Sequence, residues 1–310
     1  MLGFSRAQST GLVAMLALIV LAPAVLYPMF LMKVLCFALF ACAFNLLIGY
    51  LGLLSFGHAA YFGMGSYVAA WAAKNWGLSA EACILLGGLT GAGIGAVFGW
   101  MAVRRSGIYF SMITLALAQM VYFFCVQVSF TGGEDGIQRV PRPSLFGIIS
   151  LQSDMAMYWL TATIFLAGFL AIHRIVHSPF GQVMKAIREN EPRATSLGYR
   201  TDDYKWMAFV LSTFLAGIAG GTKALAFGIA TLTDVDWQMH GEVVLMSLVG
   251  GLGTVFGPAM GALVLTAMEN YLAQFGSWVT VIQGAIFVLC VLAFRRGIIG
   301  ELGAVLRLEL

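Results

Sequence analysis

Charged residues are scarce in this 310-residue chain: Asp, Glu, Lys and Arg make up only 10% of it, whereas hydrophobic residues make up 60%. Water-soluble domains carry about 25% charged residues. The mean hydropathy of +0.90 is likewise typical of a protein that resides in lipid. The net charge of +3 is too small to indicate a nucleic-acid-binding surface. The composition therefore indicates an integral membrane protein with one membrane domain.

The sequence also lacks the motifs of catalysis and of metal binding. It contains no GxxxxGK[ST] phosphate loop, no GxSxG nucleophile motif and no HExxH zinc motif. His173 and His177 have the spacing of a metal-binding pair without a third ligand nearby, so we interpret them as a solvated interface pair at a cytoplasmic helix end. The five cysteines lie inside apolar segments without paired spacing, which is typical of buried small side chains. They are Cys36, Cys42, Cys83, Cys125 and Cys290. We therefore expect neither a membrane-embedded enzyme nor a cofactor bound by this chain.

Apolar runs of helical length follow one another along the chain. They predict a helical bundle, because a transmembrane barrel shows short alternating segments instead. The glycine-broken stretch 240–273 is expected to form two short spans that turn near Gly250–Pro258. We expect the other spans near 11–32, 34–52, 57–73, 82–103, 107–130, 156–176, 206–228 and 278–294. The prediction is one all-α, polytopic domain over residues 1–310 with about ten spans.

The distribution of basic residues sets the expected orientation. With both termini in the cytoplasm, most of the seventeen Lys and Arg residues fall on the cytoplasmic side, as the positive-inside rule requires. Loop 131–155, with its glycine-rich turn and its prolines, then lies on the exterior side. Loop 177–205 lies on the cytoplasmic side.

Loop 177–205 is the longest polar stretch and carries five of the seventeen basic residues and four of the fourteen acidic ones. Ser178-Pro179 is placed to start a short helix, Asn190 to cap the start of a second, and Gly198 to end it. Such a pair either lies on the lipid surface or forms a rigid knob that docks into a groove on a partner. Its mixed charges favour docking, because helices on a membrane surface are typically rich in cations.

Polar side chains inside spans are costly and therefore informative. Asn45 and His58 flank the glycine-rich break 49–57, where they either face a cavity with freed backbone carbonyls or satisfy hydrogen bonds between helices. Lys223 lies near an outer span end and is expected to extend to the interface. Glu269 is the one intramembrane carboxylate available to an ion-coupled carrier, and we expect it near the outer interface.

Glycines recur at four-residue spacing, which places them on one face of a helix and lets helices pack closely. Two such stripes are Gly87, Gly91, Gly95 and Gly99, and Gly253, Gly257 and Gly261. A weak internal echo also relates residues 47–52 to 248–253 and residues 56–59 to 256–259. It indicates either a repeat around two interrupted helices or a shared glycine-rich composition.

Loop 177–205 resembles the coupling loop of ABC importer permeases, which carries an Ala-x-x-x-Gly core after an acidic stretch. Here the core is Ala194-Thr195-Ser196-Leu197-Gly198, after Arg188-Glu189-Asn190-Glu191. Pro192 and Arg193 depart from the small or acidic residues of the general motif. The resemblance implies that an ATPase subunit docks on Glu191, Pro192, Arg193, Ala194, Leu197 and Gly198.

Nearly the whole chain resembles the LivM-type permease of the branched-chain amino acid uptake family. The matching segments are 45–50, 54–59, 131–136, 178–181, 250–253 and 296–300. The resemblance implies a multi-pass permease subunit of an ABC importer in the bacterial cytoplasmic (inner) membrane. Its translocation pathway would include Asn45, Gly57, His58, Thr131, Gly132 and Gly133.

The resemblance also implies a set of partners. They are a second related permease, two ATPase subunits that bind ATP and Mg²⁺, an extracytoplasmic substrate-binding protein and membrane lipid; no nucleic acid is expected. The implied substrates are branched-chain or other hydrophobic amino acids. An importer of urea or short amides, and an ion-coupled secondary transporter, are the alternatives.

Overall fold

The computed structural model describes residues 6–272, 278, 281–282, 284–285, 287–288 and 297–306. The helices are α1 (Arg6–Leu21), α2 (Pro28–Ile48), α3 (His58–Trp71), α4 (Ala80–Ala102), α5 (Ile108–Gln127), α6 (Asp154–Val176), α7 (Pro179–Ser196), α8 (Thr201–Phe227), α9 (Trp237–Gly250), α10 (Gly257–Leu272) and α12 (Gly297–Leu306). The short turns are η1 (Ala22–Ala24), η2 (Ala72–Trp76), η3 (Ser129–Thr131), η4 (Gly133–Asp135) and η5 (Leu232–Asp234). Within these residues the extended pairings are two isolated bridges. The described chain is therefore all-α, as predicted.

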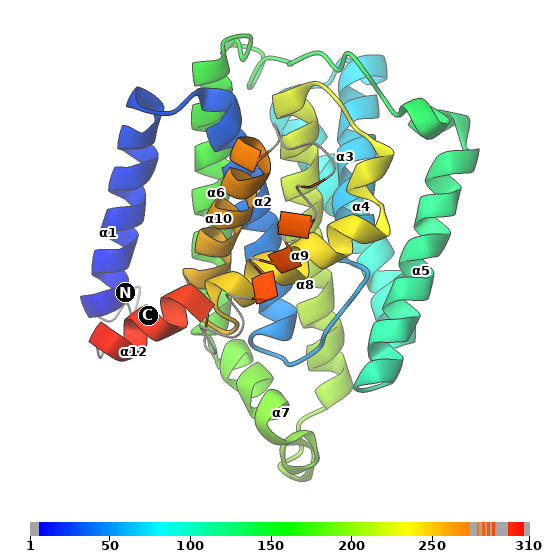
Figure 1. Cartoon of the computed structure of the whole chain (residues 1–310). Coiled ribbons are helices and arrows are strands. Elements are labelled where there is room, and N and C mark those ends of the chain that lie inside the picture. The colour runs from blue at the N-terminus through cyan, green and yellow to red at the C-terminus, as the bar shows by residue number, and fades with distance from the viewer. Residues whose placement is uncertain are drawn as a thin grey trace.

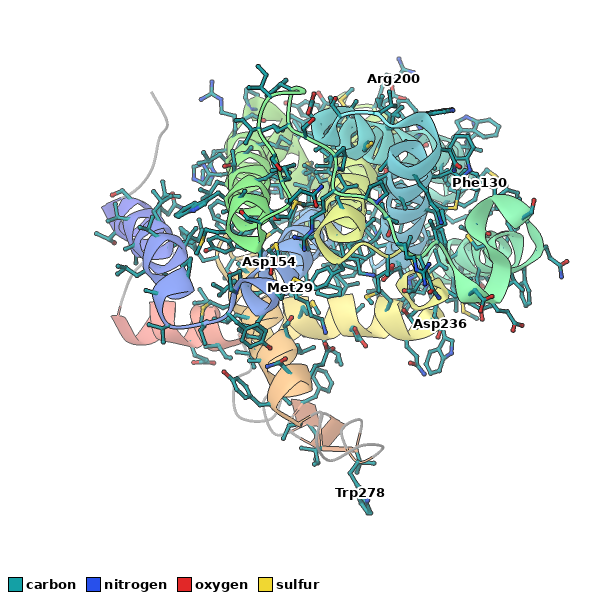
Figure 2. The ribbon with its side chains drawn as sticks, turned by 90° about the horizontal axis from the view of Figure 1, so that it is seen from above. Met29, Phe130, Asp154, Arg200, Asp236 and Trp278 are labelled. Carbon is teal, nitrogen blue, oxygen red and sulfur yellow. The ribbon has the colours of Figure 1, made fainter. Side chains whose placement is uncertain are left out.

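The long helices run side by side, and α7 projects from one end of the bundle (Figure 1). We call this end of the bundle the α7 end. We call the opposite end, which carries residues 128–153, the loop end. Helices α1 and α5 lie at the two edges of the view in Figure 1. Helix α9, which begins after Asp236, lies obliquely across the bundle and does not run along it (Figures 1 and 2).

Helix α2 forms the centre of the core. It packs against α6, α8, α9 and α10, and Met32, Phe40, Phe44 and Leu47 are fully buried. A helix that is apolar on every side belongs in such a position, because no face of it requires water.

Five helices in the described part of the chain are long and apolar enough to cross a membrane: α2, α4, α5, α6 and α8. Helices α3, α9 and α10 have 14, 14 and 16 residues, and at 1.5 Å per residue they are shorter than a hydrocarbon layer of about 30 Å. The chain is thus a multi-pass helical bundle. About ten crossings and cytoplasmic termini stay predictions, and most of the expected span 278–294 lies outside the described residues.

The predicted boundary between the first two spans was wrong. The chain breaks at 22–27, and α2 begins at Pro28, where the missing N–H of proline costs nothing because the first helical N–H has no partner within the helix. Lys33, which separates the expected spans 11–32 and 34–52, lies within α2, and its Nζ is 2.8 Å from Glu269 Oε2 on α10. A partner distant in sequence therefore lets the helix continue past a charge.

The predicted start of the seventh span was also too late. Helix α8 begins at Thr201, so the last residues of loop 177–205 are already helical. Asp202 and Asp203 lie in the first turn, where the helix dipole favours acidic side chains.

The first glycine stripe packs α4 against α8 and α3. A Cβ at Gly87 would lie 2.8 Å from Gly65 O on α3, and a Cβ at Gly91 would overlap the carbonyl oxygen of Thr213 on α8. A Cβ at Gly65 would lie 2.5 Å from Gly217 O. The three helices therefore meet backbone to backbone, as the four-residue spacing predicted.

The second stripe is divided between a helix and a turn. Stretch 240–273 forms two helices, as expected, and a Cβ at Gly261 of α10 would overlap the carbonyl of Met246 on α9. Gly253, which we had placed on the same helix, lies in the break 251–256 with a φ of +76°. Its role is to turn the chain, because residues other than glycine rarely adopt this φ.

The α4–α8 contact gives a stability prediction with a control on the same helix. We expect Gly91→Ala to destabilise the protein by about 1–3 kcal/mol, the usual cost of overpacking. The reason is that the added methyl group meets the backbone of α8. Gly93→Ala should be nearly neutral, since no described atom lies within 4 Å of a Cβ there. Thermal unfolding in detergent measures both variants, and equal stability of the two would contradict the packing.

Candidate functional site

Helix α7 consists of two short helices, as predicted. The backbone of Asn190 is extended (φ −160°, ψ 94°) and separates them. Ser178 Oγ caps the first helix by accepting a hydrogen bond from Gly181 N at 3.3 Å. Asn190 Oδ1 caps the second by accepting from Arg193 N at 3.0 Å. Each start thus has a side chain that satisfies a backbone N–H left free by the helix.

The second short helix ends at a glycine. Gly198 has a φ of +89° and donates to Thr195 O at 2.9 Å, while Tyr199 N donates to Ala194 O at 3.3 Å. This hydrogen-bond pair is a Schellman motif, which requires the left-handed conformation at its glycine. A Cβ at Gly198 would meet no described atom within 4 Å. The glycine is therefore needed for its backbone conformation and not for space.

Glu191 fixes the second short helix to the start of α8. Its Oε1 accepts hydrogen bonds from Lys205 Nζ and, at 3.2 Å, from Thr201 Oγ1. Lys205 is only 4% exposed, and such a charge requires a partner. Pro192 lies in the first turn, where its missing N–H is tolerated. These contacts make the tip of α7 rigid.

The tip presents an apolar side chain to the surroundings. Leu197 is 71% exposed, whereas Ala194 is buried, and Arg193 is exposed. An open groove of about 920 Å³ lies between the first helix of α7 and the start of α8; its walls include Phe180, Val183, Leu197, Tyr199, Tyr204 and Met207. Sequence reasoning missed this groove because it forms only when α7 folds back against α8.

Asn45 joins the two interrupted helices. Its Nδ2 donates to Thr254 O and its Oδ1 accepts from Gly253 N, both at 3.0 Å. A Cβ at Gly49 would lie 2.7 Å from Gly253 N. The break after α2 therefore lies directly against the break after α9, and the two segments that echo each other in sequence are neighbours in space.

His58 is the first residue of α3 and is completely buried. Its Nε2 lies 2.9 Å from Ser212 Oγ on α8, and that hydroxyl donates to Ala43 O on α2 at 2.5 Å. Gly57 precedes it, and a Cβ there would lie 3.0 Å from Thr114 O. His58 thus joins three helices at the point where α3 begins.

A second histidine, His240 on α9, meets the same turn of α3. Its Nδ1 accepts from Ala59 N at 3.1 Å. His58 Nδ1 and His240 Nε2 have no hydrogen-bond partner among the described residues. Sequence reasoning missed His240 because it stands at the edge of an expected span.

The family of the chain is decided by comparison with known proteins. A family model described as the branched-chain amino acid transport system / permease component matches residues 26–291. The chain belongs to this family. The match covers α2 to α10, and so includes α7 and both helix breaks.

Individual relatives agree with the family. The chain is 26% identical over 278 residues to the high-affinity branched-chain amino acid transport system permease protein LivM of Salmonella typhimurium; the match covers 82% of this chain and 65% of the relative. It is 24% identical over 284 residues to LivH of the same organism, with 86% and 91% covered. The autoinducer 2 import system permease protein LsrC of Shigella flexneri is 28% identical over 226 residues, with 69% and 61% covered. No solved structure matches the chain significantly.

The remaining predicted pathway residues of this family member lie elsewhere. Thr131, Gly132 and Gly133 lie at the loop end, after α5, and the structure does not bring them together with Asn45 and His58. Thr131 is buried, and its hydroxyl donates to Cys125 O at 2.5 Å and to Val128 O at 2.7 Å. Gly132 and Gly133 have positive φ. The contacts of Thr131 are therefore those of a turn that ends α5.

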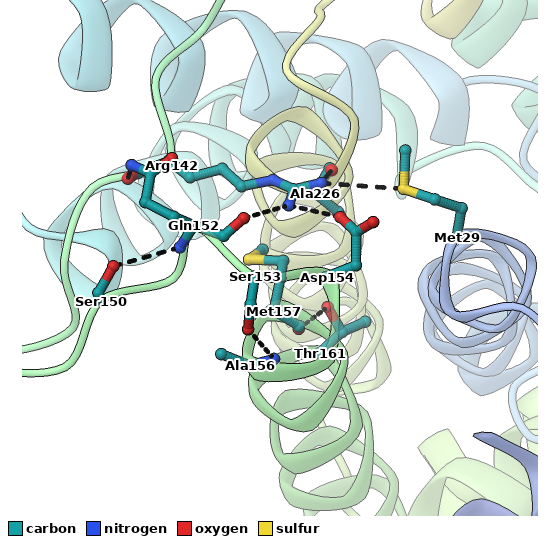
Figure 3. Close-up of polar contacts among 10 residues, drawn as sticks. All are labelled: Met29, Arg142, Ser150, Gln152, Ser153, Asp154, Ala156, Met157, Thr161 and Ala226. Atoms are coloured by element: carbon teal, nitrogen blue, oxygen red, sulfur yellow. Dashed lines mark hydrogen bonds and ion pairs between the residues drawn. The ribbon is translucent and has the colours of Figure 1, made fainter. Parts of the chain in front are cut away.

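Arg142 fixes the loop end of the permease (Figure 3). Its Nη1 lies 2.7 Å from Asp154 Oδ1 at the start of α6, and its Nη2 donates to Ala226 O near the end of α8 at 2.7 Å. Gln152 Nε2 donates back to Arg142 O at 3.1 Å. One arginine thus ties the loop between α5 and α6 to two helix ends.

The prediction that Lys223 extends to the membrane interface was wrong. Its Nζ lies 2.8 and 2.7 Å from the two carboxylate oxygens of Asp234. Asp234 is 3% exposed and also accepts from Thr231 N at 3.3 Å. The lysine turns inward because Asp234, in the connection after α8, folds over the end of its helix.

His173 and His177 stack with ring centroids 4.1 Å apart. The prediction that both are solvated was wrong for His173, which is buried on the inner side of α6, whereas His177 is exposed. Among the described residues, no group of three or more His, Cys, Asp or Glu side chains is placed to hold a metal. Cys36, Cys42, Cys83 and Cys125 are free and buried, and Cys290 lies outside the described residues.

The Glu191–Lys205 pair gives a prediction about the rigidity of α7. We expect Glu191→Gln to lower stability by about 2 kcal/mol, because it leaves a buried charge with a neutral partner. Asp203→Asn breaks the exposed Arg200–Asp203 pair and should cost at most about 0.5 kcal/mol. Thermal unfolding, with limited proteolysis of residues 177–205, measures both; equal sensitivity of the two variants would show that Glu191 does not anchor α7.

Proposed function

We propose that this chain is a permease subunit of an ATP-driven importer in the bacterial inner membrane, and that it forms half of a translocation path for branched-chain or other hydrophobic amino acids. The family match over residues 26–291 is the observation that carries the proposal. The partners are a second related permease, two ATPase subunits with their ATP and Mg²⁺, and an extracytoplasmic binding protein.

The shape of α7 supports ATPase docking on this chain. The second short helix is capped at both ends and held by Glu191. It therefore transmits a displacement of the ATPase to α8 without bending. Leu197 lies exposed at its tip, beside the groove along α8. Exposed apolar side chains on a rigid helix are suited to insertion into a groove on a partner. Because the sequence contains no phosphate loop of its own, we assign ATP to the partner subunits.

The charge distribution supports a cytoplasmic position for the α7 end. Arg104 and Arg105 lie in the turn between α4 and α5, and Arg174 lies near the end of α6; all three are exposed. The basic residues of α7 lie at the same end. Basic residues concentrate on the cytoplasmic side of membrane proteins.

The substrate class rests on the relatives and on the apolar interior. LivM and LivH carry branched-chain amino acid transport in their names, while the name of LsrC refers to autoinducer 2. Most buried side chains of the described residues are apolar, which is compatible with the passage of an amino acid with an apolar side chain.

The ion-coupled alternative has little support at Glu269. This carboxylate is paired with Lys33 and partly exposed, near the end of α10. A coupling-ion site is expected near the middle of the membrane.

Co-purification and ATP-dependent uptake test the proposal. Gentle solubilisation from the native membrane should yield the chain with a second permease and two ATPases, identified by mass spectrometry. Vesicles that contain this complex and the binding protein should take up leucine or isoleucine only with internal ATP. A chain that purifies alone and transports without ATP would refute the proposal.

Three substitutions distinguish a coupling surface on α7 from an ion site at Glu269. Leu197→Asp and Gly198→Asp should reduce uptake at least tenfold while the bundle stays folded, because both place a charge at the docking tip. Glu269→Gln should retain most uptake, because ATP is the energy source. Normal uptake by both tip variants, or loss of uptake by Glu269→Gln alone, would count against ATPase coupling through α7.

A further inference from the structure

Arg188 connects the first helix of α7 to the end of α2. Its Nη1 donates a hydrogen bond to the carbonyl oxygen of Gly49, and its Cγ would lie 3.1 Å from a Cβ at Gly52. Lys185, one turn earlier, places its Nζ 5.9 Å from the ring centroid of Tyr50. The first helix of α7 is therefore docked on the residues where α2 ends.

The same guanidinium also lies against the second helix break. A Cβ at Gly253 would lie 3.2 Å from Arg188 Nη1 and 3.1 Å from Gly49 O. Asn45 completes the contact by bonding both Gly253 N and Thr254 O. One arginine and one asparagine thus join α7, the end of α2 and the turn between α9 and α10.

The first helix of α7 has the support that such a connection needs. Val183, Met184 and Ile187 are buried, so the helix cannot roll without losing apolar contacts. Gly49 O lies just after α2, where helix carbonyls lose their partners and the helix dipole attracts a cation. Gly52 and Gly253 leave room for the arginine, because a Cβ at Gly52 would lie 3.1 Å from Arg188 Cγ and a Cβ at Gly253 would lie 3.2 Å from Arg188 Nη1.

We propose that Arg188 is a positioning residue that makes α7 and the two helix breaks move as one unit. Displacement of α7 then reaches the α2–α3 and α9–α10 breaks directly, through the contacts of Arg188 with Gly49 and Gly253. This inference rests on the proposed function, and it assigns the mechanical link to a residue outside the docking tip.

The first test compares energy use with transport in proteoliposomes that contain the whole importer. Arg188→Met keeps an unbranched apolar side chain at this position and removes the guanidinium with its donors. We expect the amount of substrate transported per ATP hydrolysed to fall at least fivefold, with the complex assembled and ATP hydrolysis retained. Arg105→Met, an exposed arginine of the α4–α5 turn, is the matched control and should keep the ratio of the unmodified protein.

The results distinguish failure of this inference from failure of the proposed function. A ratio for Arg188→Met within fivefold of the unmodified protein overturns the inference. Loss of the assembled complex from both Arg188→Met and Arg188→Lys would show a folding role and overturns it as well. If the unmodified complex does not transport with ATP, the proposed function fails instead.

The second test replaces the arginine with a covalent link. A Cβ at Gly52 would lie 3.7 Å from Arg188 Cβ, within the range of about 3.5–4.5 Å for a disulfide. In the double variant Gly52→Cys, Arg188→Cys, the reduced form should be uncoupled like Arg188→Met. The oxidised form should recover transport per ATP, and reduction with dithiothreitol should abolish the recovery. An oxidised form that stays uncoupled, or a pair that does not cross-link, contradicts the proposed unit; Gly52→Cys alone is the control for strain at this positive φ.

Discussion

The structure depends on one requirement: backbone groups freed by breaks in helices must find hydrogen-bond partners, because lipid offers none. The break after α2 meets this requirement with side chains from several helices. Ser111 Oγ donates to Leu54 O at 2.7 Å, and Phe56 N donates to Thr114 Oγ1 at 3.1 Å. His240 accepts from Ala59 N. The break is therefore a built element of the bundle that α5 and α9 hold in place.

The break after α9 has a different set of partners. Asn45 satisfies Gly253 N and Thr254 O, and Thr254 Oγ1 accepts from Gly257 N at 3.1 Å. Asn45 stands at the end of α2, so the break after α9 lies against the helix that leads into the break after α2. A movement of α2 thus changes the surroundings of both breaks, and Arg188 ties α7 to the same place.

Part of the fold and of the candidate site was predictable from local signals in the sequence. Ser178, Asn190 and Gly198 act on backbone groups within three or four residues, so their capping roles were readable without tertiary knowledge. The glycine stripe on α4 was readable from its four-residue spacing, whereas the second stripe was predicted only in part, because Gly253 lies in the turn before α10. Other contacts join residues that are further apart in the sequence: Asn45 with Gly253, Lys223 with Asp234, and Lys33 with Glu269. Such pairings have no signature in one sequence, so the predicted boundary at Lys33 and the predicted interfacial position of Lys223 were both wrong.

The glycine seam between α3, α4 and α8 has a dynamic consequence. Glycine has no side-chain rotamers to lose on burial, and backbone atoms in direct contact cannot slide without separating first. We therefore expect these three helices to move as one block. A change of shape of the permease is then expected around this block, in helices such as α2, α9 and α10.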